Sequence, residues 1–302
     1  MRRIFKGFGI LVLLVFIAVA FKLVPPHLQI RSVSPDLPTT AQLQGLRTVD
    51  NGPVKISYIN TASQSLGDVV FGYSTFVVEW EDGKILLIDL GMDEAEAVEF
   101  GKLIEKIMSA DPTIPHGPTA KFLGGDIARV QGVAFTHLHS DHVQGVEALC
   151  KAGARAVTAL HAPYQMTKHN LHTKAPFEML QNSVCLKQMT LAHGAYTSEQ
   201  FPGVGIFPMG GHTPGSTLFA VPVAGKLWLL SGDITNTKND LINNTGKGAL
   251  YSYIFVPEHE ARLKTLRQWL RELETAPDTT VVVAHDIRVL EKSGIPEWQA
   301  AE

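Results

Sequence analysis

The segment FTHLHSDHVQG at residues 135–145 places three histidines and an aspartate within six positions. Imidazole nitrogens and carboxylate oxygens are lone-pair donors at neutral pH, and both bind one or two divalent cations. In an extended segment alternate side chains share a face, so His137 and His139 are expected to point the same way. Asp141 and His142 follow the strand and are free to turn toward a second point. This cluster therefore predicts a metal centre rather than an ordinary solvated turn.

Three further segments place a metal-competent side chain after a short apolar run. "GGHTPGS" carries His212, "KLWLLSGD" ends in Asp233, and "TVVVAHD" contains His285. Short apolar runs bounded by turn residues predict buried strands, and repetition of this layout at four places argues for one shared site. Two divalent ions about 3.5–4 Å apart share one hydroxide, because they lower the pKa of bound water from about 15.7 toward about 7. Such a site needs no serine or cysteine nucleophile.

The combined pattern resembles the metallo-β-lactamase fold superfamily over roughly residues 53–290, including "LLIDLGM" around Asp89. The resemblance implies an α/β fold, a four-layer αββα sandwich, and two Zn²⁺ or other divalent ions. It assigns His137, His139 and His212 to a first metal site, and Asp141, His142 and His285 to a second. Asp233 would bridge both ions, and Asp141 and Asp233 would have catalytic roles.

The same resemblance implies a hydrolase that attacks an ester, lactone, thioester or related bond of a small molecule with a metal-bridging hydroxide. Class B β-lactamases lack an aspartate at the position of Asp233, which disfavours an antibiotic-resistance role. Acyl-homoserine-lactone lactonases share the ligand set but carry a tyrosine three residues after the bridging aspartate, where this chain has Asn236. Thioester hydrolases of the glyoxalase-II type share the set too, although their basic substrate-binding tail is not evident here. A phosphodiesterase and a non-hydrolytic, iron-binding member with persulfide or oxygen chemistry remain as alternatives.

Other catalytic signatures are missing from the sequence. There is no G-x-S-x-G elbow, phosphate loop or G-x-G-x-x-G fingerprint. The two cysteines, Cys150 and Cys185, form no C-x-x-C motif, and each is predicted to be a buried thiol. The other histidines that we considered are predicted to be ordinary surface or satisfied residues, with His169 and His172 as candidates for a pocket wall. They are His161, His169, His172, His193 and His259.

The N-terminal segment, residues 1–24, is predicted to be a signal peptide or a membrane anchor. Positive charges in "MRRIFK" precede an uncharged stretch, Gly7–Phe21. Fifteen residues at about 1.5 Å each span about 22 Å, short of the roughly 30 Å hydrocarbon core, which favours a signal. "AVA" at 18–20 offers a cleavage site, whereas extension through Leu23 and Val24 gives an uncleaved anchor. Both readings predict an exported, periplasmic or otherwise extracytoplasmic protein that contacts the membrane if it is uncleaved.

The rest of the 302-residue chain is predicted to be a linker, residues 25–52, and one hydrolase domain, residues 53–302. "VKISYINTAS", "VVFGYSTFVVEW" and "KILLIDLG" predict opening strands, with "EDG" as a turn. Apolar residues at helical spacing within 100–108 and 263–273 predict two helices whose stripes are core. Tyr251, Tyr253 and Phe255 are interpreted as core packing rather than an acyl pocket. A net charge of −3 without a basic stripe excludes nucleic acid as a favoured partner, and the sequence sets no oligomeric state.

Overall fold

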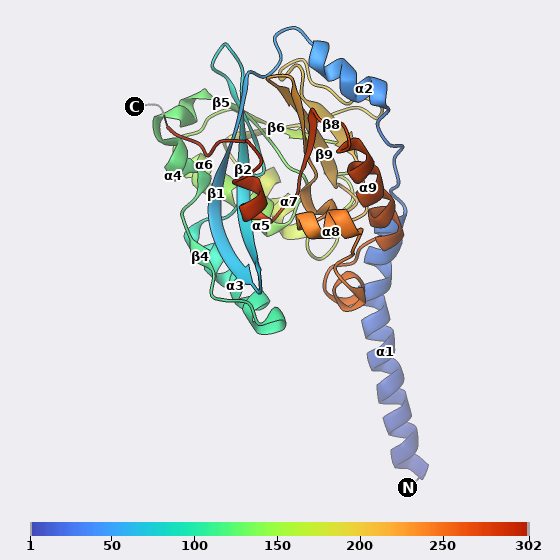
Figure 1. Cartoon of the computed structure of the whole chain (residues 1–302). Helices are drawn as coiled ribbons and strands as arrows, with labels where there is room; N and C mark the ends of the chain where they lie inside the picture. Colours follow the sequence, from blue (N-terminus) through green and yellow to red (C-terminus); the bar gives the residue numbers. More distant parts are fainter. Residues whose placement is uncertain (1, 301–302) are drawn as a thin grey trace.

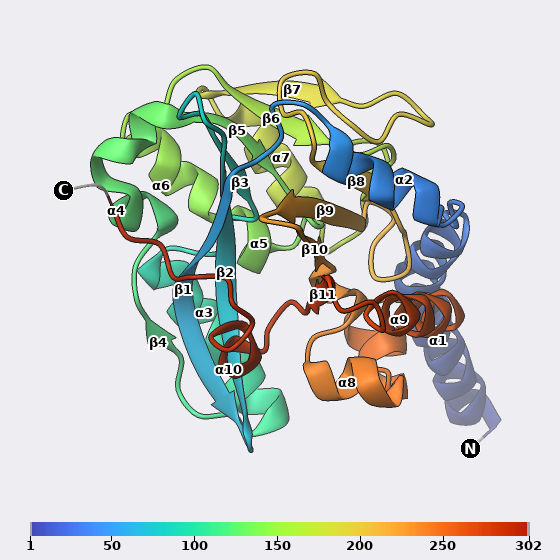
Figure 2. The same ribbon diagram turned by 45° about the horizontal axis from the view of Figure 1, so that its top comes forward.

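Two β-sheets packed against each other form the centre of the molecule (Figures 1 and 2). The computed structural model describes residues 2–300; Met1, Ala301 and Glu302 lie outside the described part. In residues 2–300 the larger sheet has seven strands in the order β4-β1-β2-β3-β5-β6-β7. Its strands are β1 (Lys55–Leu66), β2 (Val69–Glu79), β3 (Ile85–Ile88), β4 (Ile114–Pro115), β5 (Val130–Ala134), β6 (Val157–His161) and β7 (Leu186–Thr190). The three strands predicted from the opening of the domain are confirmed as β1, β2 and β3.

The smaller sheet has four strands in the described residues, in the order β11-β10-β9-β8. They are β8 (Gly205–Pro208), β9 (Thr217–Val223), β10 (Lys226–Leu230) and β11 (Thr279–Val282). β10 and β11 are parallel, and the other neighbours in this sheet are antiparallel. The carboxyl ends of β10 and β11 therefore lie at the same edge of the sheet.

Helices cover the outer face of each sheet, which gives the predicted αββα order (Figure 2). Beside the larger sheet lie α3 (Glu94–Met108), α4 (Thr119–Leu123), η2 (Gly124–Arg129), α5 (Ser140–Val143), α6 (Gly145–Lys151) and α7 (Lys174–Asn182). Beside the smaller sheet lie α2 (Thr40–Gly45), η1 (Leu46–Thr48), α8 (Lys238–Asn243) and α9 (Glu260–Leu273). Three short elements complete the fold: η3 (Gly232–Ile234), η4 (Tyr251–Phe255) and α10 (Ile287–Leu290).

The sequence of strand β3, ILLI, is apolar at every position because both faces of the strand are covered. Leu86 and Ile88 pack in the core between the two sheets, whereas Ile85 and Leu87 pack against the outer helices. Because successive side chains of a strand point to opposite faces, a strand that is covered on both sides needs apolar residues at every position. The predicted "EDG" turn is also present, with Gly83 at φ 83° donating its backbone N–H to the carbonyl of Trp80.

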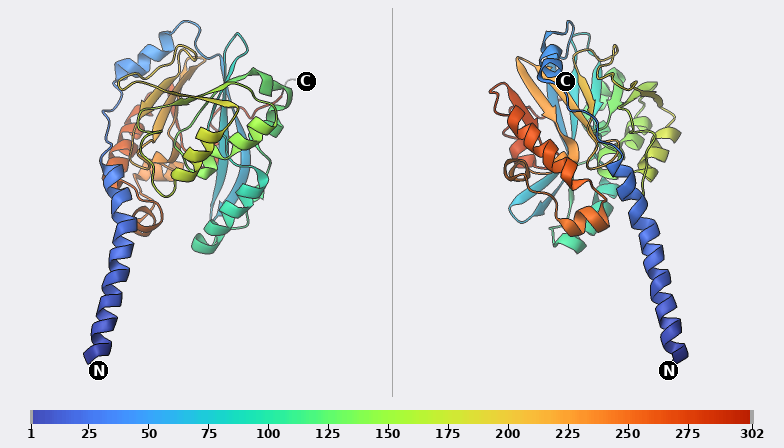
Figure 3. Two further views of the ribbon diagram at one scale, coloured as in Figure 1. Left: turned by 180° about the vertical axis from the view of Figure 1, so that it is seen from behind. Right: turned by 90° about the vertical axis from the view of Figure 1, so that its right-hand side faces the viewer.

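The N-terminal helix α1 (Arg2–Arg31) is continuous through Pro25 and Pro26 and projects from the domain (Figures 1 and 3). Among the described residues it is the one helix long and apolar enough to cross a membrane, over Val12–Arg31, a test that a signal sequence also passes. The segment 25–52, which is predicted to be a linker, has regular structure. It contains the end of α1 and the capped helix α2, and Leu43 is buried on the smaller sheet. The domain boundary at residue 53 stays a prediction.

Two sequence expectations about packing are wrong. Cys150 and Cys185 are not buried thiols but form a disulfide, because α6 and the start of β7 bring their Cα atoms to 5.5 Å. The apolar stripe of α9 is core, as predicted. In α3, however, Leu103 and Ile107 are 59% and 44% exposed, because this half of the helix extends beyond the sheet and lines an open pocket.

Candidate metal centre

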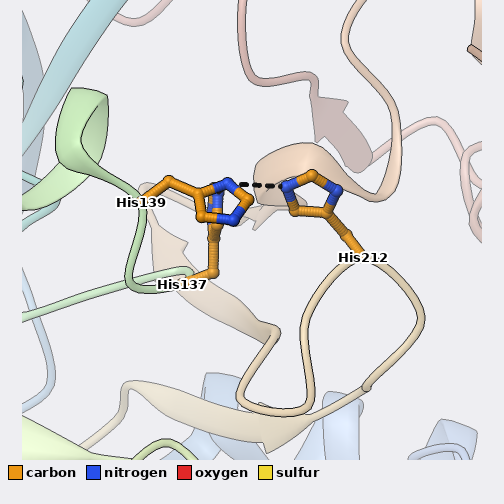
Figure 4. A group of neighbouring side chains, drawn as sticks. All are labelled: His137, His139 and His212. Carbon is orange, nitrogen blue, oxygen red and sulfur yellow. Dashed lines mark hydrogen bonds between the residues drawn. The ribbon is translucent and has the colours of Figure 1, made fainter. Parts of the chain in front are cut away.

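Three histidine side chains from two loops meet at one point. His137 and His139 follow β5, and His212 lies in the loop between β8 and β9. Nδ1 of His139 is 3.0 Å from Nε2 of His137 and 3.1 Å from Nε2 of His212. The three rings converge in Figure 4, where a dashed line joins His139 to His212. This is the group that the sequence assigned to the first metal site.

A second group of donors adjoins the first. It consists of Asp141 and His142 on α5 and His285 after β11. Oδ2 of Asp141 is 3.5 Å from Nε2 of His142 and 3.6 Å from Nε2 of His285. All three residues are buried. The structure therefore brings together the residues that the sequence assigned to the second site.

Asp233 stands between the two groups. Its Oδ2 is 3.5 Å from Nε2 of His212, and its Oδ1 is 3.4 Å from Nε2 of His142 and 3.0 Å from Nε2 of His285. One oxygen thus faces each group, which is the geometry that a bridging carboxylate requires. All seven predicted ligands lie at this one place.

Gly232 allows the strand that carries Asp233 to approach the histidine loop. Its φ is 51°, and a Cβ there would lie 2.6 Å from Cβ of Thr136, the residue before His137. Any larger residue would be strained by the backbone and blocked by Thr136. The close approach that this glycine permits is therefore to Thr136.

Three of the candidate ligand histidines are each held through their second ring nitrogen. Nδ1 of His142 is 2.9 Å from Oδ2 of Asp89, Nδ1 of His212 is 2.6 Å from Oε1 of Glu258, and Nδ1 of His285 is 3.0 Å from the carbonyl of Gly72. Asp89 also accepts from the backbone N–H and hydroxyl of Thr136, at 2.7 and 2.8 Å. Such contacts fix the ring orientation and leave Nε2 facing the donor group.

Burial and neighbouring charges set the protonation of the group. Burial, with the adjacent histidines, lowers the pKa of His137 and of His139 well below the ordinary value, which favours the neutral, metal-binding form. Burial also opposes the charged form of Asp233, but Lys247 and His285 outweigh it and lower the pKa of that carboxyl. For His142, Asp89 and Asp141 outweigh burial and raise the pKa of the imidazole. His137 and His139 are thus held in the neutral form and Asp233 in the ionised form, which are the forms that bind a cation, whereas a cation bound by His142 would have to displace a proton.

The donor set fits divalent metal ions. Nε2 of His142 and Oδ1 of Asp233 are buried 3.4 Å apart, and among residues 2–300 neither atom makes a hydrogen bond of normal geometry. A buried polar atom left without such a bond costs up to about 1–3 kcal/mol, and a cation between these two atoms would satisfy both. Imidazole nitrogens with carboxylate oxygens are the ligands of zinc, and they also suit iron and nickel.

A pocket of about 380 Å³ opens above this centre. Its floor includes His139, Asp141, Asp233 and His285, and one wall is the apolar face of α3. Opposite lie His172, Tyr251, Phe255 and Val256. The interpretation of Tyr251 and Phe255 as core packing is therefore wrong, because η4 ends beside the pocket instead of inside the core.

Sequence reasoning missed two charged residues of the site. Lys247 is half-buried, with its side chain 13% exposed and Nζ 3.0 Å from Oδ2 of Asp233 and 3.3 Å from Oε1 of Glu258. For Glu258, Lys247 and His212 outweigh burial and lower the pKa to about 2. Both residues lie in an irregular segment between α8 and α9, where no local pattern marks them.

The other histidines mostly behave as predicted. His161 is buried between Gln165 and Gln188, with each ring nitrogen 2.8 Å from a side-chain oxygen. His169 stacks on Phe177 at 3.7 Å between ring centroids. His172 is the candidate that does line the pocket, 6.2 Å from the ring of His139.

Comparison with known proteins gives a family and a fold. A family model described as the metallo-beta-lactamase superfamily matches residues 67–285. The chain is similar to an N-acyl homoserine lactone hydrolase solved with N-hexanoyl-L-homoserine at its catalytic metal centre, at 18% identity and TM-score 0.56, over 80% of this chain and 96% of that chain. It is similar, at 18% identity and TM-score 0.57 over the same shares, to a mutant of B. thuringiensis AiiA with N-decanoyl-L-homoserine at the active site. A probable metal-dependent hydrolase from Staphylococcus aureus is 15% identical, with TM-score 0.51, over 78% of this chain and 91% of that chain. No curated protein sequence matches the chain, and at these identities the solved structures show the fold alone.

Proposed function

This chain belongs to the metallo-beta-lactamase superfamily, and we propose that it is a dinuclear zinc-dependent hydrolase of esters, lactones or thioesters. The observation that carries the proposal is Asp233, whose two oxygens face two separate donor groups. A single-ion member of the family would need only one of these groups. Here every donor of both groups is present, and the donors are buried or nearly so.

The proposed roles follow from the contacts of each residue. His137, His139 and His212 would hold one ion, Asp141, His142 and His285 the other, and Asp233 both. When bound, two such ions supply a hydroxide at neutral pH and polarise the oxygen of the bond that is cleaved. Asp89 and Glu258 keep His142 and His212 in the binding orientation. Lys247 adds a fixed positive charge at the pocket floor, where negative charge develops on the substrate.

An acyl substrate suits the shape of the pocket. Ligand sites combine apolar walls with a few polar groups that orient the reacting bond, and this pocket has an α3 wall above a charged floor. Two proteins to which the fold is similar were solved with acylated homoserines bound, an N-acyl homoserine lactone hydrolase at its catalytic metal centre and the AiiA mutant at its active site. Asn236 occupies the place of the lactonase tyrosine, but Tyr251 reaches the same pocket from η4. We therefore rank lactones and other acyl esters above phosphodiesters.

We also propose that the protein works outside the cytoplasm. The apolar helix α1 supports this location, and so does the disulfide, because disulfides persist in oxidising compartments.

The test is turnover by the full chain of a panel of lactones, thioesters, carboxylic esters and phosphate esters, with Asp233→Asn as the variant. Asparagine keeps the shape but removes the negative charge between the two cations. We expect the variant to lose activity by at least about 100-fold, the scale of losing a major electrostatic contribution. Asp50→Asn, an exposed aspartate in a turn, is the matched control and should retain full activity. Full activity in Asp233→Asn, or no turnover of the panel by a zinc-loaded wild type, would refute the mechanism.

Elemental analysis separates this proposal from the non-hydrolytic alternative. We expect close to two divalent ions per chain, mainly zinc. One iron per chain in protein made without metal supplementation would favour persulfide or oxygen chemistry instead.

A further inference from the structure

Exposed apolar side chains border the mouth of the pocket on two sides. On one side, the end of α3 exposes Leu103, Ile107 and Met108. On the other, Leu250 is 61% exposed and Ile254 in η4 is 53% exposed. Isolated exposed apolar residues are ordinary, but a group around a pocket marks a binding surface. We call these five residues the apolar rim.

The apolar rim lies on the side of the domain from which α1 projects. In Figures 1 and 3 the end of α3, the tip of the β1–β2 hairpin and the segment containing η4 all face the direction in which α1 extends. The strand β1 begins at the opposite end of the domain (Figure 1). A membrane entered by α1 would therefore lie on the side of the pocket mouth.

Contacts on both sides of the pocket fix α1 relative to the mouth. Nε2 of His27 is 3.0 Å from the carbonyl of Tyr253 in η4, and the two rings are 5.4 Å apart. The side-chain amide of Gln29 donates to the carbonyl of His169 at 3.0 Å, in the segment that leads to His172. α1 is thus docked on two segments that also supply residues of the pocket wall, and it is not a free tether.

The length of the apolar run places the bilayer close to the rim. The segment from Gly7 to Val24 has 18 residues and one charged side chain, Lys22, which lies near its end and can reach the headgroups. At about 1.5 Å each these residues span about 27 Å, close to the roughly 30 Å hydrocarbon core. His27, which contacts η4, is three residues beyond Val24, or about 5 Å along the helix axis. Apolar side chains of peripheral helices enter the headgroup and acyl boundary by about 5–10 Å, so the rim is within reach of it.

We propose that α1 remains as an anchor, that the apolar rim rests in the bilayer surface, and that the substrate is an amphiphile whose hydrocarbon chain enters the pocket from the bilayer. The wall formed by α3 leads from the rim, at Ile107, to Phe100 deeper in the pocket, and it would carry the chain. Water adds across the acyl–oxygen or acyl–sulfur bond at the floor, and a carboxylate and an alcohol or thiol leave. The substrate part of this inference rests on the proposed hydrolase function; the contact with the bilayer does not.

Fluorescence quenching tests the contact with the bilayer without any use of activity. Full-length Leu250→Trp and Ile254→Trp are reconstituted in phosphatidylcholine vesicles whose acyl chains carry bromine, a short-range quencher. Val54→Trp is the control, because Val54 is 48% exposed and precedes β1 at the far end of the domain. The unmodified chain, with its four native tryptophans, gives the background. We expect quenching above background at 250 and 254 but not at 54; equal quenching at all three positions would overturn the docking.

Kinetics test the source of the substrate. The double variant Leu250→Ser/Ile254→Ser changes two rim residues that do not line the pocket. We expect its kcat/KM to fall by about tenfold for a long-chain ester in vesicles, the scale of losing part of two apolar contacts. Its kcat/KM for a short, water-soluble ester should be unchanged, and equal losses on both esters would refute entry from the bilayer. If neither ester is hydrolysed by the wild type, the hydrolase proposal fails, while the quenching result still decides the docking.

Discussion

Removal of the disulfide is the perturbation whose size follows most directly from the fold. Cys150 and Cys185 are separated by 35 residues, and the closed loop contains β6 and α7. For a loop of about 35 residues, the chain-entropy relation gives about 13 cal/mol/K, or about 4 kcal/mol at 25 °C. Measured effects typically fall at 2–4 kcal/mol, since the unfolded chain retains some structure. We therefore expect Cys150→Ala/Cys185→Ala to lower the free energy of unfolding by about 3 kcal/mol.

The assay is denaturant unfolding of the full chain in detergent, after expression in an oxidising compartment, with and without reductant. Reductant should lower the midpoint of the wild type and leave the midpoint of the double variant unchanged. Cys185 is 2% exposed, so alanine also removes buried sulfur, and the difference between reduced wild type and variant measures this packing loss. Two free thiols in the exported protein, or identical midpoints for oxidised and reduced wild type, would refute the reasoning.

Three further outcomes test the site and the location of the protein. Gly232→Ala should lower the free energy of unfolding by about 2–4 kcal/mol, because it combines a left-handed backbone with a clash against Thr136; an unchanged thermal midpoint would contradict this. Asp89→Asn should weaken zinc binding about 10–100-fold, since the charge that orients His142 is lost, and a zinc titration of folded protein decides it. A reporter that functions only outside the cytoplasm, fused after residue 30, should be active; activity of a cytoplasm-only reporter instead would end the export proposal.

The clustering of the seven candidate ligands was predictable because their signal is local. In the segment FTHLHSDH, a strand end and the alternation of side chains suffice to bring His137 and His139 to one face. Asp141 and His142 follow in the same segment, and His212, Asp233 and His285 each come after a separate apolar run, as Asp233 does after "LWLLSG". Parallel pairing of β10 and β11 then places Asp233 and His285 at one edge of the sheet. Local pattern and sheet topology together determine this part of the site.

Residues that act through long-range contacts had no such signal. Glu258 meets His212 across 46 positions, and Lys247 meets Asp233 across 14, through a segment without regular period. The disulfide is a similar case, because two cysteines 35 residues apart carry no information on whether α6 and β7 are neighbours. Pairings of this kind are consequences of the tertiary fold, so they can be read only after the fold is known.

The helix α3 shows a limit of hydrophobic periodicity itself. A stripe of apolar residues at helical spacing indicates that one face leaves water, but it does not say what that face meets. In α9 the stripe meets the sheet, and Leu263, Leu266 and Leu270 are buried as predicted. In α3 the same pattern continues past the sheet, so Leu103 and Ile107 meet the pocket instead. In the proposed arrangement, lipid and substrate cover the part of the stripe that the sheet leaves exposed. A helix face that packs in a core and a helix face that meets a membrane therefore have the same apolar sequence pattern.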